Sequence, residues 1–306
     1  MKVSVVVPCY NEELSVERFY REATAVFSGQ AFDYELIFVD DGSSDNTFLK
    51  LGELAKADNK VKVLSFSRNF GQQAAIICGF RASTGDAVVE MDCDLQDPVE
   101  VVLEMVKRFE EGFEVVHGRR LSRKGESRFK KSTAKAYYKF LNKITTSKIP
   151  QNTGDFKLLS RRVCDIICEL SEKGKYLRGL ESWVGFKQTF VDFERHARQE
   201  GETKYTLKKM VRLAKDGVIS FSEWPLTLSI KFGIGFSALS VIAAIVLAVL
   251  NICGVYTHPL YYLFPFNGLI GGLLMVFKGI SDMYLHKTYE QVKDRPEYVI
   301  DKKINL

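Results

Sequence analysis

Two patterns of apolar residues alternate along roughly the first 120 positions of the chain. Short runs of aliphatic and β-branched residues predict strands, and the stretches between them, where apolar residues recur every three or four positions, predict helices. Strand and helix in regular succession are typical of an α/β fold with a mostly parallel sheet covered by helices on both faces. The predicted strands are Lys2–Val7, Tyr34–Asp40, Val61–Phe66, Asp86–Met91 and Phe113–His117, and the predicted helices are Glu12–Phe27, Asn46–Ala57, Gly71–Ala82 and Pro98–Glu110.

The last third of the chain has a different pattern, because no Asp, Glu, Lys or Arg occurs from Phe232 to Phe277. A helix over Phe232–Tyr256, with a rise of about 1.5 Å per residue, is long enough to cross a hydrocarbon core of about 30 Å. A second apolar run, Tyr262–Tyr284, contains Pro265 and predicts a crossing centred on Asn267–Met283. Two C-terminal transmembrane helices are therefore expected.

Basic residues lie outside the two predicted spans, whereas the loop between them, Asn251–Pro265, contains no Lys or Arg. By the positive-inside rule, both ends of the chain and the large N-terminal part are expected in the cytoplasm. The expected location is the inner membrane of the cell, crossed twice. The flanking basic residues are Lys208, Lys209, Arg212, Lys215 and Lys231 before the first span, and Lys278, Lys287, Lys293 and Arg295 after the second.

A basic, amphipathic helix is predicted over Lys204–Phe221, just before the first span. Two interpretations stay open: a helix lying on an anionic membrane surface, or an ordinary helix that faces the core of the N-terminal part. The expected organisation is a cytoplasmic catalytic domain over residues 1–203, a juxtamembrane amphipathic region over 204–228, a transmembrane hairpin over 229–288 and a cytoplasmic tail over 289–306.

The composition excludes several classes of protein. Lys and Arg number 43 against 38 Asp and Glu, a mild excess that is not typical of nucleic-acid binding, so no nucleic acid is expected as a partner. With 46% hydrophobic and 26% charged residues, extensive disorder is not expected. The six cysteines form no Cys-x-x-Cys pair, and no His lies at zinc-finger spacing, which argues against a disulfide framework and a structural zinc site.

Polar residues gather where three predicted strands end, in Pro8–Glu12, Asp40–Asp45 and Met91–Asp97. Ligands of parallel α/β sheets bind beyond these carboxyl ends, so the three segments are candidates for one site. An Asp-x-Asp pair by itself is also common in turns, and Asp45 is equally suited to cap the helix that follows it.

Asp92 and Asp94 lie one residue apart after the strand Asp86–Met91, and Gln96 follows them. Hard divalent cations prefer oxygen ligands and keep part of their coordination shell for phosphate oxygens. The segment therefore predicts a metal–diphosphate site with Mg²⁺ or Mn²⁺ as cofactor, where the ion stabilises negative charge on a leaving diphosphate.

Four ordered motifs resemble the nucleotide-sugar-binding domain of family 2 inverting glycosyltransferases with the Rossmann-like GT-A fold: VVVPCYNEE, IFVDDGSSDNT, SRNFGQQAA and MDCDLQDP. Further along, the chain is similar to the polyisoprenyl-phosphate glycosyltransferases, the group of dolichyl-phosphate mannose synthase and the bactoprenol glucosyltransferases. The features of this second resemblance are GDFKLLSRR, GFKQ, Arg195, Arg198, Gly201–Tyr205 and the two predicted spans. Together the resemblances cover essentially the whole chain.

The resemblance implies roles for residues at the three strand ends. It implies a metal site at Asp92, Asp94 and Gln96, with Asp94 also counted among the catalytic residues and Asp92 also facing the nucleotide sugar. The remaining residues that match the family's nucleotide-sugar pocket are Pro8, Tyr10, Asn11, Glu12 and Asp41.

The resemblance also implies a site for the acceptor phosphate. Arg128 and Ser132 are similar to an Arg-x-x-x-Ser pattern that, with a later arginine, receives the lipid phosphate in dolichyl-phosphate mannose synthases. The later arginine is Arg195 or Arg198, and Arg128 is also counted as catalytic. Asp155 resembles an acidic residue discussed as catalytic in the glucosyltransferase branch. Whether it acts as a base or orients a donor stays open.

The expected activity is that of an inverting hexosyltransferase, which moves a hexose from a nucleotide sugar to polyprenyl phosphate, either undecaprenyl or dolichyl phosphate. A phosphate monoester has a second pKa of about 6, so this acceptor needs no strong base at neutral pH, and phosphate-binding arginines are expected instead. Candidates besides those named above are Arg119, Arg120 and Arg178.

Several alternatives stay open. UDP-glucose is the first choice of donor, followed by GDP-mannose and the UDP-N-acetylhexosamines. A processive polysaccharide synthase is less favoured, because the usual Gln-x-x-Arg-Trp motif and additional spans are lacking. A non-enzymatic sugar-nucleotide sensor or a flippase-like partner is a further alternative. Gly268 and Gly272, at small-xxx-small spacing, leave open a homo-oligomer through the spans.

Overall fold

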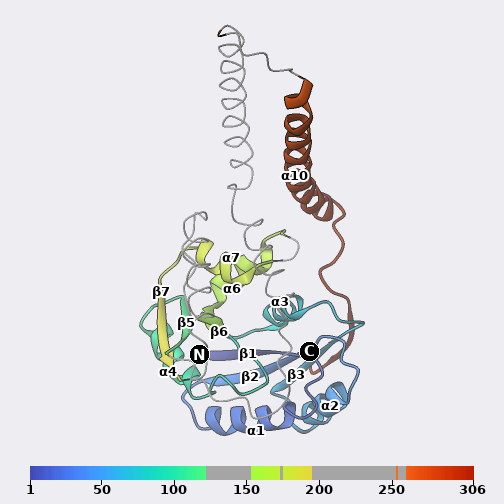
Figure 1. Cartoon of the computed structure of the whole chain (residues 1–306). Helices are drawn as coiled ribbons and strands as arrows, with labels where there is room; N and C mark the ends of the chain where they lie inside the picture. The colour runs from blue at the N-terminus through green and yellow to red at the C-terminus, as the bar shows by residue number, and fades with distance from the viewer. Residues whose placement is uncertain (122–152, 173–174, 195–252, 254–259) are drawn as a thin grey trace. The chain divides into compact units, whose positions relative to one another are not determined.

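The computed structural model describes residues 1–121, 153–172, 175–194, 253 and 260–306 (Figure 1). The chain divides into two compact units. The first contains the sheet, its helices and the end of the chain from Pro296 to Leu306, and the second contains helix α10 (Leu260–Val292).

The first unit is built on an eight-stranded sheet with the strand order β7-β5-β6-β4-β1-β2-β3-β8. Strands β4, β1, β2 and β3 pair in parallel, as do β5 and β7, whereas β6 is antiparallel to both β4 and β5, and β8 is antiparallel to β3. The strands are β1 (Lys2–Cys9), β2 (Asp33–Asp40), β3 (Val61–Phe66), β4 (Ala87–Glu90), β5 (Val115–Arg120), β6 (Thr153–Ser160), β7 (Gln188–Phe193) and β8 (Ile300–Ile304).

Helices cover both faces of the sheet, which confirms the predicted α/β architecture (Figure 1). Residues of α1, α2 and α4 share one hydrophobic cluster, and residues of α3, α6 and α7 share the other. Alternate residues of β1 supply both clusters, Val5 on one face and Val6 on the other, as the two-residue period of a strand requires. The helices are α1 (Val16–Phe27), α2 (Thr47–Ala57), α3 (Gln72–Ala82), α4 (Val101–Glu110), α6 (Arg161–Glu169) and α7 (Leu177–Trp183).

The end of the chain belongs to the sheet. Residues 289–306 are expected as a tail, but Ile300–Ile304 forms the edge strand β8, paired with β3 from Val63 to Phe66. Tyr298 stacks on Phe66, with ring centroids 5.0 Å apart. The tail therefore contributes to the first unit.

The membrane-associated expectations are only partly covered by the structure. The expected span Tyr262–Tyr284 falls within the helix α10, whereas Phe232–Tyr256, except for Cys253, and the basic helix Lys204–Phe221 lie outside the described residues. Over the part of the chain that is described, no helix has the combination of length and apolar character needed to cross a bilayer.

A buried carboxylate stabilises the end of the sheet where β1 and β2 begin. The side chain of Glu35 is 2% exposed and forms ion pairs with Lys2 at 2.7 Å and Lys62 at 2.9 Å. It also accepts hydrogen bonds from Ser4 Oγ at 2.6 Å and the Thr84 backbone N–H at 2.8 Å. Burial acts to raise the pKa of Glu35, but the two lysines and the hydrogen bonds outweigh burial and lower this pKa to about 2.

The low pKa of Glu35 predicts a pH-dependent contribution to stability. Because the folded-state pKa lies below the ordinary value of 4.5, the contribution is present above pH 4.5 and is lost as the pH falls toward 2. At pH 7 we expect Glu35→Gln to lower the free energy of unfolding by on the order of 3 kcal/mol, and by less at pH 3. Denaturant unfolding of the full chain in detergent measures both values. The exposed Glu100→Gln is the control, and an equal loss at both pH values would contradict the assignment.

Candidate functional site

The three polar segments predicted from the sequence meet at one edge of the sheet. They follow β4, β1 and β2, which are neighbours in that order, so their carboxyl ends lie side by side. The loops after β1 and β2 are joined by hydrogen bonds: Ser43 Oγ accepts from the Asn11 backbone N–H at 2.9 Å, and Asn11 Oδ1 accepts from the Ser44 backbone N–H at 2.9 Å.

The segment after β1 presents an exposed aromatic ring. Tyr10 is 41% exposed, and Asn11 beside it has a left-handed φ of 53°, a conformation that is uncommon outside glycine. Glu12 is held by Thr47 Oγ1, which accepts from its backbone N–H at 2.8 Å. Pro8 lies within β1, one residue before its end. The structure therefore brings these four predicted residues to the site edge and fixes the backbone under Tyr10.

Asp41, at the end of β2, is engaged with the loop after β3. Its side chain is buried and accepts hydrogen bonds from the backbone N–H groups of Phe70 at 2.7 Å and Gly71 at 2.9 Å. Burial raises the pKa of Asp41 above its ordinary value despite these hydrogen bonds. The neighbouring Gly42 has a φ of +66°, and a Cβ there would lie 2.4 Å from the Arg68 carbonyl carbon. Asp41 thus fixes the loop after β3 against the end of β2.

Asp92 and Asp94 follow β4 in a segment whose geometry is fixed locally. Asp92 Oδ1 accepts from Gln72 Nε2 at 2.9 Å, and Asp94 Oδ1 accepts from the Gln96 backbone N–H at 3.2 Å. Leu95, between Asp94 and Gln96, has a left-handed φ of 52°. Gln72, in the first turn of α3, is not among the predicted site residues, although it lies within the motif SRNFGQQAA, which is the signal that could have found it.

Asp155 reaches the same edge from β6. Because β6 is antiparallel to β4 and pairs Lys157 with Glu90, the start of β6 lies beside the segment that carries Asp92. Burial, followed by the charges of Asp155 and Asp94, raises the pKa of Asp92 to about 7. The structure therefore brings Asp155 to the Asp92–Asp94 pair, which the sequence predicts separately from it.

Two arginines complete this cluster. Arg178 of α7 donates to both carboxylate oxygens of Asp155, at 2.8 and 3.1 Å. Burial acts to raise the pKa of Asp155, but Arg178 outweighs it and the pKa falls to about 2, so this carboxylate stays ionised at neutral pH. Arg120, at the end of β5, donates to Asp97 Oδ2 at 3.1 Å.

The arginine Arg120 lies against Gly154 at the start of β6. A Cβ at Gly154 would lie 2.6 Å from the terminal Nη2 of Arg120, so the guanidinium occupies the space that a side chain would take. Arg120 is mostly buried, and its Nε is without a hydrogen-bond acceptor among the described residues. The guanidinium of Arg120 is therefore a mostly buried cation at this edge of the sheet, and its Nε–H is unpaired among the described residues.

The donor set fits a divalent cation shared with a phosphate ligand. Within the described ranges, no three His, Cys, Asp or Glu side chains converge as a complete metal cage. Asp92, Asp94 and Gln96 supply carboxylate and amide oxygens, and Mg²⁺ or Mn²⁺ bound by two carboxylates takes its other ligands from water and phosphate. Among the described residues, four carboxyl groups and two guanidinium groups gather here, those of Asp92, Asp94, Asp97 and Asp155 and those of Arg120 and Arg178.

The predicted acceptor residues are not covered by the structure. Arg128 and Ser132 fall in 122–152, and Arg195 and Arg198 fall in 195–252, which are both outside the described residues. Their roles stay predictions.

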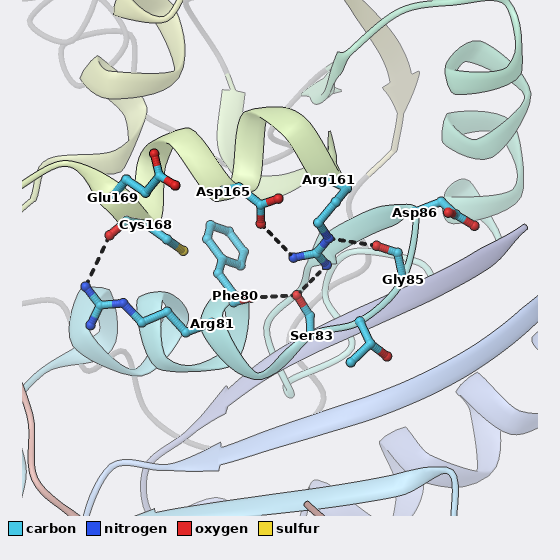
Figure 2. A pocket seen from close by; sticks show the side chains of 10 residues that line it. Phe80, Arg81, Ser83, Gly85, Asp86, Arg161, Asp165, Cys168 and Glu169 are labelled. Atoms are coloured by element: carbon cyan, nitrogen blue, oxygen red, sulfur yellow. Dashed lines mark hydrogen bonds and ion pairs between the residues drawn. The ribbon is translucent and has the colours of Figure 1, made fainter.

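A separate groove lies at the opposite edge of the sheet, where β4 begins (Figure 2). Its central cation is Arg161, which donates to Gly85 O at 2.9 Å, Ser83 Oγ at 2.7 Å and Asp165 Oδ1 at 3.2 Å. Each nitrogen of this guanidinium already donates to a protein acceptor. Arg161 therefore gives no evidence of a ligand site in this groove. The groove plays no part in the site described above.

Sequence comparison relates the chain to known proteins along its whole length. Residues 4–167 match the family described as glycosyl transferase family 2. The uncharacterized glycosyltransferase YkcC of Bacillus subtilis (strain 168) is 42% identical, with 100% of this chain and 95% of that protein covered.

Two further relatives have names that state an activity. The prophage bactoprenol glucosyl transferase homolog of Escherichia coli (strain K12) is 36% identical over 98% of both chains. The bactoprenol glucosyl transferase of Shigella phage SfII is 35% identical, covering 99% of this chain and 98% of that protein.

Proposed function

Because this chain belongs to glycosyl transferase family 2, we propose that it transfers a hexose from a nucleotide sugar to polyprenyl phosphate. In this reaction the bond between the sugar C1 and the diphosphate breaks, and a bond from C1 to a lipid-phosphate oxygen forms with inversion, which releases the nucleoside diphosphate. Relatives named bactoprenol glucosyl transferase, matched over nearly the whole chain, support a lipid phosphate acceptor and glucose as the sugar. UDP-glucose is therefore our first choice of donor.

The cluster at the carboxyl edge of the sheet is the observation that carries the proposal. Asp92, Asp94 and Gln96 would hold Mg²⁺ or Mn²⁺, which supplies charge stabilisation to the leaving diphosphate when bound. Arg120, whose side chain is 12% exposed, lies beside this segment and would add positive charge near the diphosphate. The exposed ring of Tyr10 offers a surface on which the nucleotide base can stack.

Asp155 is proposed to act as a fixed anion and not as a general base. Its pKa of about 2 makes it a weak proton acceptor at neutral pH. The lipid phosphate needs no such base, since it is already mostly dianionic there. In this proposal Asp155 keeps Arg178 directed at the reacting groups, where the guanidinium can meet an incoming phosphate.

The membrane arrangement is part of the same proposal. We infer that the catalytic part, residues 1–203 together with the edge strand in 289–306, works at the cytoplasmic face of the membrane. The region 204–228 would lie on the bilayer surface and the hairpin 229–288 would cross it, as the apolar and basic patterns predict. Such an anchor holds the active site at the depth of the lipid phosphate.

The donor is tested with membrane fractions that contain the full chain, undecaprenyl phosphate and Mg²⁺ or Mn²⁺. Radiolabelled UDP-glucose, GDP-mannose and UDP-N-acetylglucosamine are supplied separately, and label is followed into lipid extracted with organic solvent. We expect label from UDP-glucose. Label from another donor alone would correct the sugar, and no lipid label from any donor would contradict the acceptor.

The contact between Arg120 and Gly154 gives a prediction for catalysis. Gly154→Ala displaces the tip of the Arg120 side chain, so we expect kcat/KM for the nucleotide sugar to fall about tenfold while the melting temperature changes little. The matched control is Gly52→Ala on α2, where a Cβ meets only Ile304 Cδ1 at an ordinary 3.6 Å. Equal kinetics for Gly154→Ala and wild type would show that Arg120 does not act on the substrate.

A further inference from the structure

Three buried ionisable residues lie next to the Asp155–Arg178 pair, and burial raises the pKa of one of them, Glu90, well above its ordinary value. Lys157 of β6 is fully buried, and its ammonium group forms ion pairs with Glu181 of α7 and, at 3.2 Å, with Glu90 of β4. The side chains of both glutamates are 2% exposed. We call Glu90, Lys157 and Glu181 the buried triad.

Within the buried triad, the Lys157–Glu181 ion pair joins β6 to α7, as the Asp155–Arg178 pair also does. Asp155 and Lys157 are two residues apart on β6 and therefore lie on one face of the strand. Arg178 and Glu181 are three residues apart on α7 and lie on one face of the helix. Two ion pairs of opposite polarity, Asp155–Arg178 and Lys157–Glu181, thus join the same strand to the same helix.

The third member connects this linkage to the metal-binding segment. Glu90 is the last residue of β4, two positions before Asp92, and it is the register partner of Lys157. Burial acts to lower the pKa of Lys157, but Glu181 and Glu90 outweigh burial and raise it, so the ammonium stays charged. A buried charge costs desolvation energy that an apolar side chain would avoid, so a contribution to stability alone does not account for the triad.

We propose that Glu90, Lys157 and Glu181 are positioning residues, which hold α7 on β6 so that Arg178 keeps both of its hydrogen bonds to Asp155 beside Asp92. This inference rests on the proposed function, because it concerns the geometry of the reacting groups. The triad itself touches neither nucleotide nor lipid. Its effect on the reaction passes through Arg178 and Asp155.

The test compares two isosteric variants of the full chain, Glu181→Gln and Glu35→Gln. Both remove a buried carboxylate that is 2% exposed and paired with lysine, but Glu35 lies at the opposite end of the sheet. We expect Glu181→Gln to lower kcat about tenfold or more with the KM for the nucleotide sugar nearly unchanged, because the nucleotide pocket after β1 and β2 is untouched. Glu35→Gln is expected to lower stability and leave kcat unchanged.

Hydrogen exchange of α7 supplies a readout that does not need turnover. Backbone amides of Leu177–Trp183 are expected to exchange faster in Glu181→Gln than in wild type, and at the wild-type rate in Glu35→Gln. Unchanged kcat in Glu181→Gln, or an equal fall of kcat in both variants, overturns the inference. If wild type transfers no sugar, the proposed function fails. In that case faster exchange confined to Glu181→Gln still supports the triad's hold on α7, and unchanged exchange overturns it.

Discussion

Asp94→Asn is expected to lower the transfer of sugar to lipid phosphate by roughly 10²- to 10³-fold. The substitution keeps the shape of the side chain and an oxygen able to accept from the Gln96 backbone N–H, but it removes one of the two carboxylates proposed to bind the cation. The transition state then loses charge stabilisation at the diphosphate, whereas the packing of the segment is retained. Initial rates with saturating UDP-glucose, Mn²⁺ and undecaprenyl phosphate measure the loss.

The matched control for Asp94→Asn is Asp301→Asn, an exposed aspartate on the edge strand β8. This variant should turn over at the wild-type rate. Retention of more than about a tenth of wild-type activity by Asp94→Asn would show that this carboxylate does not serve the reaction as proposed. Raising the Mn²⁺ concentration should recover part of the lost rate, since the variant retains Asp92 and Gln96.

Lys157→Met should have the largest effect on stability. Removal of the ammonium group leaves the buried Glu181 without its counterion, and breaking a buried ion pair in this way costs about 3–5 kcal/mol. Denaturant unfolding of the full chain in detergent measures the change in the free energy of unfolding. The control is Lys50→Met, which removes a partly exposed pair with Glu17 at 3.5 Å and should cost less than about 1 kcal/mol. Equal losses for both variants would contradict this account of the triad.

The first five strands and four helices were predictable to within a few residues because their signal is local. Val3–Val7 is a β-branched run, broken only by Ser4, that is buried on both faces, and the helix over Val16–Phe27 buries residues at three- and four-residue spacing, such as Val16, Phe19 and Ala23. Neither assignment needs knowledge of a distant partner. The same holds for the polar segments that follow these strands.

The strands β6 and β8 were not predicted, because their sequences give a weak local signal. In β6, Asp155 and Lys157 flank Phe156 and leave only a short apolar run, and the strand is specified by its antiparallel pairing with β4 and β5. In β8, three of the five residues of Ile300–Ile304 are charged, as is usual for an exposed edge strand. Both strands therefore form through pairing with strands that are distant in the sequence.

This limit also explains which part of the site the sequence could supply. Asp92 and Asp94 follow their strand directly, so their place at the site is visible in the sequence. The pairing of Asp155 with Arg178 depends on β6 lying next to β4 and on α7 packing over it, which no spacing in the chain encodes. Arg120 likewise reaches the cluster only through the β5–β6 pairing.

Release of UDP by the purified full-length protein tests the central claim most directly. Polyprenyl phosphate is titrated into a reaction with UDP-glucose and Mn²⁺, and the matched acceptor is the corresponding polyprenyl alcohol, which lacks the phosphate. The account predicts that UDP release rises to saturation with polyprenyl phosphate and is absent with the alcohol. Equal release with both lipids, or release that does not depend on lipid, would contradict transfer to a lipid phosphate.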